Sequence, residues 1–246
     1  MKPLFKLTLI DIKLYLRNFI ALFFTLVFPL LMLFLFGSMY GNEPSSIFGG
    51  YGSMDVTIPG YIATIIIGTT AFMSLPMDLA QQRQMGVLRR LRATPLRSEM
   101  VLGSKLITNL LMALIGAVIL VVSGALAYRA YMPSNWLPVL AGGVLVALSL
   151  YAIGFAIASL VRTINAVRAV CFAVFYPMMF LSGGTLPLQF MPQAVQNLSK
   201  ALPMTYAVNL MKSLWFGQGW DVTAVLALVG FMVAGVVVSV RFFRWE

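Results

Sequence analysis

Six long apolar segments, none containing a charged side chain, are spread along a chain of 246 residues. A bilayer core about 30 Å thick requires roughly 20 helical residues to cross it, and the segments reach or approach that length. Apolar residues make up 61% of the chain and charged residues only 10%, too few to cover a soluble domain. We therefore expect an all-α integral membrane protein whose transmembrane helices cover residues 20–40, 58–77, 106–128, 136–161, 169–184 and 222–240.

The basic residues indicate how these helices are oriented. Fourteen of the 17 Lys and Arg residues precede the first helix, follow the last, or lie in the second and fourth loops. Only Arg129, Lys200 and Lys212 lie in the other loops. Because cytoplasmic loops are enriched in Lys and Arg, we expect both termini in the cytoplasm and one transmembrane domain over residues 1–246. A basic face against anionic lipid then accounts for the net charge of +10 without nucleic acid.

An amphipathic segment, residues 4–17, precedes the first helix. Its apolar side chains recur at helical spacing beside a basic stripe, which is typical of a helix lying in the membrane interface. A plain cytoplasmic extension of the first helix is the alternative, with Asn18 as the cap where the chain bends. The apolar stripe is formed by Phe5, Leu9, Ile12 and Leu16, and the basic one by Lys6, Lys13 and Arg17.

Residues 80–105, between the second and third helices, carry the clearest functional signal. Apolar side chains that include Ala80 and Val87 are predicted to share one side of a short helix, surrounded by arginines. Thr94-Pro95 ends that helix, because the residue before a proline is disfavoured in the helical region. An apolar surface ringed by arginines suits a cleft on a soluble partner. A basic loop held to lipid headgroups is the alternative.

The region after the fifth helix, residues 185–216, is too apolar for a plain outer loop. Pro177 and the run Ser182-Gly183-Gly184 favour an exit from helical geometry. Apolar residues at helical spacing then predict one helix from about residue 191, broken at Pro203, and another over residues 206–215. We expect these helices to form a re-entrant hairpin in the outer leaflet, where protein or water can satisfy its turns.

Several kinds of site are missing from the sequence. The chain has no histidine, which excludes a Ser-His-Asp triad and a histidine metal site, and we expect no metal site. Gly103-Ser104-Lys105 lacks the remainder of a Walker A motif. No apolar segment carries the ionisable residue typical of an ion-coupled carrier. We therefore expect a non-catalytic transport subunit that binds no cofactor and takes its energy from a partner.

Two motifs resemble the permease subunits of bacterial ABC type-2 exporters. Residues 85–96, Met-Gly-Val-Leu-Arg-Arg-Leu-Arg-Ala-Thr-Pro-Leu, are similar to the cytoplasmic coupling stretch of that family. Residues 180–188, with Met191-Pro192 and residues 202–208, resemble its signature after the fifth helix. The sequence departs from the family pattern at Gln81, Gln82 and Gln84, where acidic residues are frequent.

The resemblance implies a multi-pass permease in the bacterial cytoplasmic (inner) membrane, with a coupling helix between the second and third transmembrane helices. It also implies a second permease copy, identical or related, and separate ABC ATPase subunits that bind ATP and Mg²⁺. The residues expected to couple to the ATPase are Arg83, Gly86, Val87, Leu88, Arg89, Leu91, Ala93, Thr94 and Pro95. Those expected to form the outer re-entrant turn are Ser182, Gly183, Gly184, Pro187 and Pro203.

The apolar character of the helices indicates the class of substrate. An apolar pathway suits outward transport of a drug, lipid or hydrophobic peptide. A glycan or lipid-linked saccharide exporter and a resistance or signalling membrane protein without transport are the alternatives. Phe and Met in membrane helices are also ordinary packing residues. The candidate pathway residues are Phe28, Phe72, Met73, Tyr176 and Met179.

Overall fold

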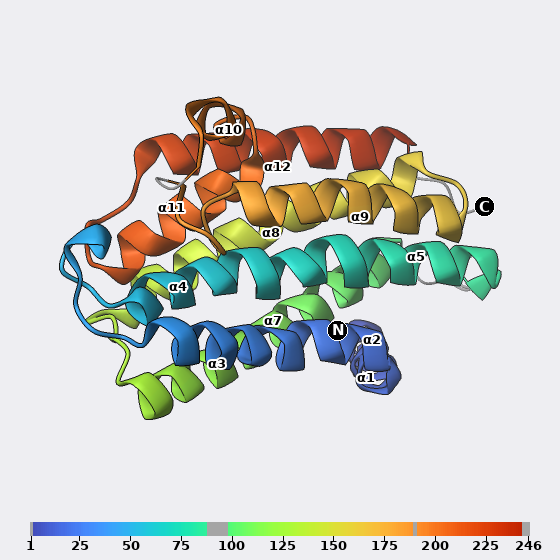
Figure 1. Cartoon of the computed structure of the whole chain (residues 1–246). Coiled ribbons are helices and arrows are strands. Elements are labelled where there is room, and N and C mark those ends of the chain that lie inside the picture. Colours follow the sequence, from blue (N-terminus) through green and yellow to red (C-terminus); the bar gives the residue numbers. More distant parts are fainter. Residues whose placement is uncertain (1, 88–97, 189–190, 243–246) are drawn as a thin grey trace.

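The computed structural model describes residues 2–87, 98–188 and 191–242, and all regular structure in these ranges is helical (Figure 1). Six helical stretches are long and apolar enough to cross a membrane, which confirms the predicted fold class. We call them spans 1 to 6. They are Phe19–Tyr40, Ser53–Gln84, Met100–Tyr128, Trp136–Leu160, Ile164–Leu181 and Val222–Phe242.

The first two spans contain π-helical turns. Span 1 consists of α2 (Phe19–Leu22), η1 (Phe23–Val27) and α3 (Phe28–Tyr40). Span 2 consists of α4 (Ser53–Tyr61), η3 (Ile62–Ile67), η4 (Thr70–Ser74) and α5 (Leu75–Gln84), and a short 3-10 turn, η2 (Ser46–Phe48), precedes it. The other four spans are α7 (Ser98–Tyr128), α8 (Trp136–Leu160), α9 (Ile164–Leu181) and α12 (Val222–Phe242).

Span 2 is longer than the apolar segment 58–77 because polar groups extend it at both ends. At its start, the Asp55 carboxylate accepts a hydrogen bond from the Gly52 N–H at 2.9 Å, so the helix begins at Ser53. Asp55 also accepts from Asn42 Nδ2 and from the Tyr131 N–H, each at 2.8 Å. Asp55 lies outside the predicted helical segment 58–77, but it is a buried helix-capping residue.

Span 2 is also the centre of the bundle. Within its most apolar window 89% of the residues are buried, against 17–56% for the other spans. Figure 1 shows α4 and α5 running between α3 on one side and α9 on the other. Small residues bring α8 close to this centre, since a Cβ at Gly154 would overlap the Ala71 carbonyl oxygen. On its other side α8 packs along α12, where Ser149 Oγ donates to Leu228 O at 2.8 Å.

Helix α1 (Lys2–Arg17) crosses the direction of the spans and is seen nearly end-on in Figure 1. Tyr15 is buried on its inner side, whereas members of the predicted apolar stripe, Phe5, Leu9 and Leu16, are 50–66% exposed. The exposed stripe supports an interfacial position, which itself stays a prediction. Asn18 caps the next helix as expected, because its Oδ1 accepts from the Ala21 N–H at 3.2 Å.

The region after span 5 forms two helices, α10 (Gln193–Ser199) and α11 (Pro203–Trp215). Pro203 is the first residue of α11, where its missing N–H costs nothing, so α11 begins three residues before the expected start. Its apolar face, including Leu210 and Leu214, is buried in the core. The two helices are therefore present, and their depth in the membrane stays a prediction.

Cysteine labelling tests the predicted orientation in a Cys171→Ala background. Glu43, Gln193 and Gln84 are all exposed, so accessibility in the folded chain does not distinguish them. If both termini are cytoplasmic, an impermeant maleimide added to intact spheroplasts will label Glu43→Cys and Gln193→Cys. Gln84→Cys will react only after permeabilisation. Labelling of Gln84→Cys in intact spheroplasts would reverse the orientation.

Candidate functional site

Of the nine predicted coupling residues, those within the described ranges lie at the end of the bundle where α1, the last turn of α5 and the first turns of α7 meet. Among them the structure describes Arg83, Gly86 and Val87. Helix α5 ends at Gln84, and Gly86 follows with φ +69°, a conformation that glycine adopts readily. The remaining six, Leu88, Arg89, Leu91, Ala93, Thr94 and Pro95, lie outside the described residues.

The predicted grouping of Ala80 with Val87 on one helix side is wrong. Ala80 belongs to α5, which continues span 2, and it is 2% exposed beside Val167 and Cys171 of α9. The turn at Gly86 separates it from Val87. Cys171 is buried in the same cluster and packs there as a small apolar side chain.

Arg83 contacts the neighbouring helix rather than projecting freely. Its Nη1 donates to Ala158 O at 3.0 Å, and its Nη2 donates to Val161 O at 2.5 Å and to Arg162 O at 3.2 Å. These carbonyls lie at the C-terminal end of α8, where unpaired oxygens and the helix dipole favour a cation. Arg83 therefore attaches α5 to the end of α8.

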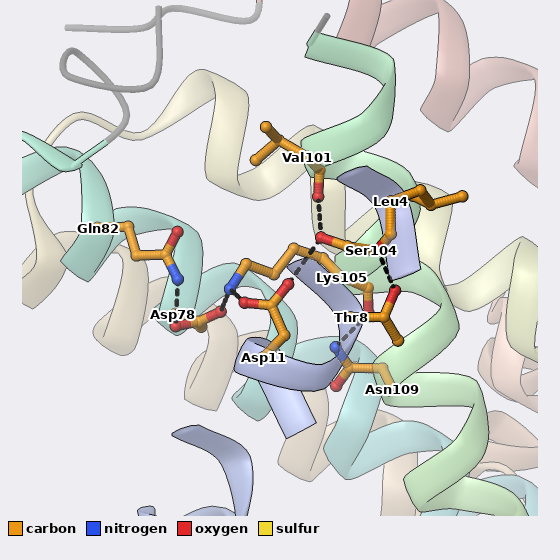
Figure 2. Close-up of polar contacts among 9 residues, drawn as sticks. All are labelled: Leu4, Thr8, Asp11, Asp78, Gln82, Val101, Ser104, Lys105 and Asn109. Carbon is orange, nitrogen blue, oxygen red and sulfur yellow. Dashed lines mark hydrogen bonds and ion pairs between the residues drawn. The ribbon is translucent and has the colours of Figure 1, made fainter. Parts of the chain in front are cut away.

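A buried charge cluster joins three helices at the same end of the bundle (Figure 2). Lys105 Nζ of α7 lies 2.5 Å from Asp11 Oδ1 of α1 and 2.6 Å from Asp78 Oδ2 of α5. The side chains of Lys105, Asp11 and Asp78 are 4%, 10% and 37% exposed. Ser104 Oγ donates to Asp11 Oδ2 at 2.7 Å, and Gln82 Nε2 donates to Asp78 Oδ1 at 3.1 Å. We call Asp11, Asp78 and Lys105 the charge cluster.

The charge cluster lies at the base of the predicted coupling segment. Helices α5 and α7 are the two arms that lead into residues 88–97, and Lys105 bridges both arms to α1. Buried ions are costly unless they are paired, so displacement of one helix would expose or unpair a charge. The cluster therefore resists independent movement of α1, α5 and α7.

A second polar contact holds α1 to span 1. The Tyr15 hydroxyl lies 2.7 Å from Thr25 Oγ1, and both residues are buried. Burial raises the pKa of Tyr15, so the phenol remains a neutral hydrogen-bonding group. Thr25 belongs to η1, and π-helical turns of this kind are frequent at functional sites. Movement of α1 would therefore reach span 1 as well.

At the opposite end of the bundle, polar side chains satisfy the turn after α9. Ser182 Oγ and Thr185 Oγ1 donate to Met179 O at 3.3 and 2.7 Å, and Lys212 Nζ donates to Gly183 O at 2.8 Å. Burial lowers the pKa of Lys212 to about 8. Four carbonyls at a helix end lack helical partners, and these donors supply some of the replacements.

Close packing explains the two glycines of this turn. Gly183 has φ +78°, which favours glycine. A Cβ at Gly184 would overlap Thr64 of η3 and approach Val208 of α11. The predicted residues Ser182, Gly183 and Gly184 are thus buried between span 2 and α11. Of the two prolines predicted for this turn, Pro203 is buried and Pro187 is half-buried.

The predicted pathway residues fall into two environments. Phe72, Met73 and Met179 are 0%, 7% and 3% exposed and belong to the core of the single subunit. Tyr176 is 36% exposed and Phe28 is half-buried. Three of the five therefore serve packing in this conformation. Within the described part of the chain, no group of three or more His, Cys, Asp or Glu residues could hold a metal ion.

The charge cluster and the contact of Lys212 were not predicted from the sequence. A signal was present: Asp78 immediately follows the second apolar segment and Lys105 immediately precedes the third. Asp11 is the first acidic residue of the chain, within a basic helix. Lone charges at the ends of consecutive membrane helices lie at similar depth, so their pairing could have been anticipated.

Substitutions in the charge cluster should rank by the charge that they leave unpaired. Lys105→Met leaves two carboxylates without their cation and should destabilise by about 3–5 kcal/mol. Asp78→Asn removes a partly exposed partner and should cost about 0–1 kcal/mol. Adding Asp11→Asn to Lys105→Met should recover part of the loss. The thermal unfolding midpoint of each variant in mild detergent measures the loss of stability, with the exposed Lys13→Met as the control. Equal midpoints for Lys105→Met and Lys13→Met would contradict the predicted ranking.

The lowered pKa of Lys212 predicts a specific pH dependence. The folded state disfavours the charged amine, so the contribution of Lys212 to stability is fully present above the ordinary value of 10.5 and is lost as pH falls through about 8. The thermal midpoint of the wild type, relative to Lys212→Met, should therefore rise between pH 7 and pH 9.5. The exposed Lys200→Met serves as the control. A flat difference across this range would show that Lys212 titrates normally.

Comparison with known proteins adds an independent finding. A family model described as ABC-2 type transporter matches residues 4–216. The chain is 26% identical over 205 residues to the putative transport permease ycf38 of Porphyra purpurea, covering 79% of this chain and 67% of that protein. It is 27% identical to Nodulation protein J of Rhizobium leguminosarum bv. trifolii, with 77% and 72% covered. It is 28% identical to the probable multidrug ABC transporter permease YbhR of Escherichia coli, covering 64% of this chain but only 43% of YbhR.

Proposed function

Because the chain belongs to the ABC-2 type transporter family, we propose that it is the membrane subunit of an ATP-driven exporter that moves a hydrophobic or amphipathic substrate outward. The observation that carries the proposal is the family match across residues 4–216, which includes spans 1 to 5 and the predicted coupling segment. ATP and Mg²⁺ bind a separate ABC ATPase subunit. The membrane subunit itself contributes no catalytic residue.

The contacts at the α1 end support a coupling role for residues 80–105. Lys105 ties both arms of the segment to α1, and Arg83 ties one arm to the end of α8. A force applied by the ATPase at residues 88–97 would therefore reach several spans together. We place this end, with both chain termini, on the cytoplasmic side of a bacterial inner membrane, because most basic residues lie there.

A second permease copy provides the pathway in this proposal. Buried side chains such as Phe72 and Met179 fill the centre of one subunit. Spans 1 and 6, in contrast, are only 22% and 17% buried within their most apolar windows. A route between two copies, identical or related, is consistent with a filled subunit centre and with the symmetry of most assemblies.

The outer aromatic residues favour an amphipathic substrate over a glycan. The Phe216 ring centroid lies 4.2 Å from that of Tyr51 and 5.8 Å from that of Tyr131. The Trp136 and Trp215 rings likewise meet edge to face at 5.6 Å. These rings pack on one another, which leaves fewer ring faces for stacking on a saccharide. A drug, lipid or hydrophobic peptide is therefore the proposed substrate class.

Two leucines of the coupling segment should carry most of its binding to the ATPase. Burial of a leucine in a partner cleft contributes about 1.5–3 kcal/mol, whereas an exposed charge pair contributes about 0–1 kcal/mol. Leu88→Asp and Leu91→Asp should therefore release the ATPase and abolish efflux while the permease still inserts. Arg89→Gln and Arg90→Gln should have smaller effects that diminish with salt.

The test is co-purification of the ATPase with each variant, combined with ATPase turnover and ethidium efflux from energised cells. The permease purified alone should show no ATP hydrolysis. Retention of the ATPase and normal efflux by both leucine variants would instead support a lipid-bound loop.

A further inference from the structure

A small polar cavity of about 40 Å³ lies beside the charge cluster, between α1, α5 and α7. Its lining includes Asp11 and Tyr15 of α1, Asp78 of α5, and Lys105, Thr108 and Asn109 of α7. The last three lie on one face of α7, because positions three and four apart are neighbours on a helix. The cavity therefore extends from the charge cluster one turn deeper along α7.

Two buried polar atoms at this cavity lack a partner among the described residues. They are Thr108 Oγ1 and Asn109 Oδ1, on residues that are 2% and 3% exposed. The amide orientation of Asn109 is set by its Nδ2, which donates to Lys105 O at 2.8 Å, so Oδ1 remains as an acceptor. Buried polar atoms are almost always hydrogen-bonded, to protein or to ordered water. Thr108 and Asn109 both line the cavity, so a ligand there could supply the missing partners.

We propose that this cavity is a water-binding site, and that its water completes the hydrogen bonding of Thr108, Asn109 and Lys105. A water molecule needs about 10–15 Å³ of such space, so two to four waters fit. The ammonium of Lys105 has three N–H donors, and its contacts with Asp11 and Asp78 account for two. Water can accept from the third and donate to Asn109 Oδ1.

Charge at the site favours water over an ion. A cation would lie beside the ammonium of Lys105, and an anion beside the carboxylates of Asp11 and Asp78. An apolar ligand would leave Thr108 and Asn109 unpaired. Water is neutral, and it can accept a hydrogen bond from the Lys105 ammonium and donate one to Asn109 Oδ1.

The water site makes the junction of α1, α5 and α7 a hydrated joint. Bridging water can exchange partners, so it keeps Lys105, Thr108 and Asn109 hydrogen-bonded through small shifts of α1 and α5 that leave the ion pairs intact. The Tyr15 hydroxyl at the cavity wall continues the polar contacts to Thr25 of η1. This role in coupling rests on the proposed function, whereas the binding of water does not.

X-ray hydroxyl-radical footprinting of the full chain in lipid nanodiscs tests for the water, because the radicals form at bound water molecules. Tyr15 at the cavity is 7% exposed, and Tyr61 in α4, away from the cavity, is 1% exposed. We expect Tyr15 to be modified at least tenfold faster than Tyr61. Thr108→Val, which preserves shape, and Asn109→Leu should each lower the Tyr15 rate severalfold. Thr64→Val, which removes an equally buried hydroxyl outside the cavity, should leave it unchanged.

Two results would overturn the proposal. Equal modification rates for Tyr15 and Tyr61 in the wild type would show a dry cavity. A fall of the thermal midpoint when Na⁺ and K⁺ are replaced by choline, abolished by Thr108→Val, would show a bound cation instead. Neither readout involves the ATPase. In the complex, Thr108→Val should retain the ATPase but lower ethidium efflux per ATP hydrolysed severalfold, and unchanged efflux would refute only the coupling role.

Discussion

Lipid offers no hydrogen-bonding partner to the backbone, and this constraint governs the architecture of the bundle. Six spans satisfy their own amides by helical geometry, but each helix end leaves carbonyls or N–H groups exposed. Long basic side chains from other elements supply part of the missing partners. Arg83 donates to the end of α8 and Lys212 to the turn after α9, while Asp55 accepts at the start of α4. These contacts also link helices, so the satisfaction of helix ends and the cohesion of the bundle are connected.

Span 2 connects the polar contacts at the two ends of the bundle. Its first turn is capped and buried, its middle packs against α8 and the turn after α9, and its C-terminal end carries Asp78 and Arg83. Span 2 contains two π-helical segments and several buried hydroxyl groups. One of these, Thr70 Oγ1, lies 3.0 Å from the Tyr151 hydroxyl. A rearrangement at the predicted coupling segment would therefore have a direct structural route along span 2 toward the turn after α9.

Much of the fold could be predicted because periodicity and charge act locally. The apolar segments indicated all six spans, and Asn18 was identified as a cap from its position between two helical patterns. Boundaries were less accurate: span 2 extends to Gln84 because backbone hydrogen bonding continues beyond the apolar residues. The grouping of Ala80 with Val87 failed for a related reason, since periodicity does not register the turn that Gly86 introduces. The candidate pathway residues were chosen by type alone, and type does not separate core packing from an exposed face.

The sequence by itself determined the membrane class, the number of spans and the family motifs, because hydrophobic length and local turn chemistry are written in consecutive residues. Only the tertiary structure decided which distant groups meet. Asp11 and Lys105 are 94 residues apart, and Lys212 reaches a carbonyl 29 residues away. Such pairs depend on how the spans pack, and spacing along the chain does not encode that arrangement. The polar cavity belongs to the same category, because it exists only where three helices meet around one buried ammonium.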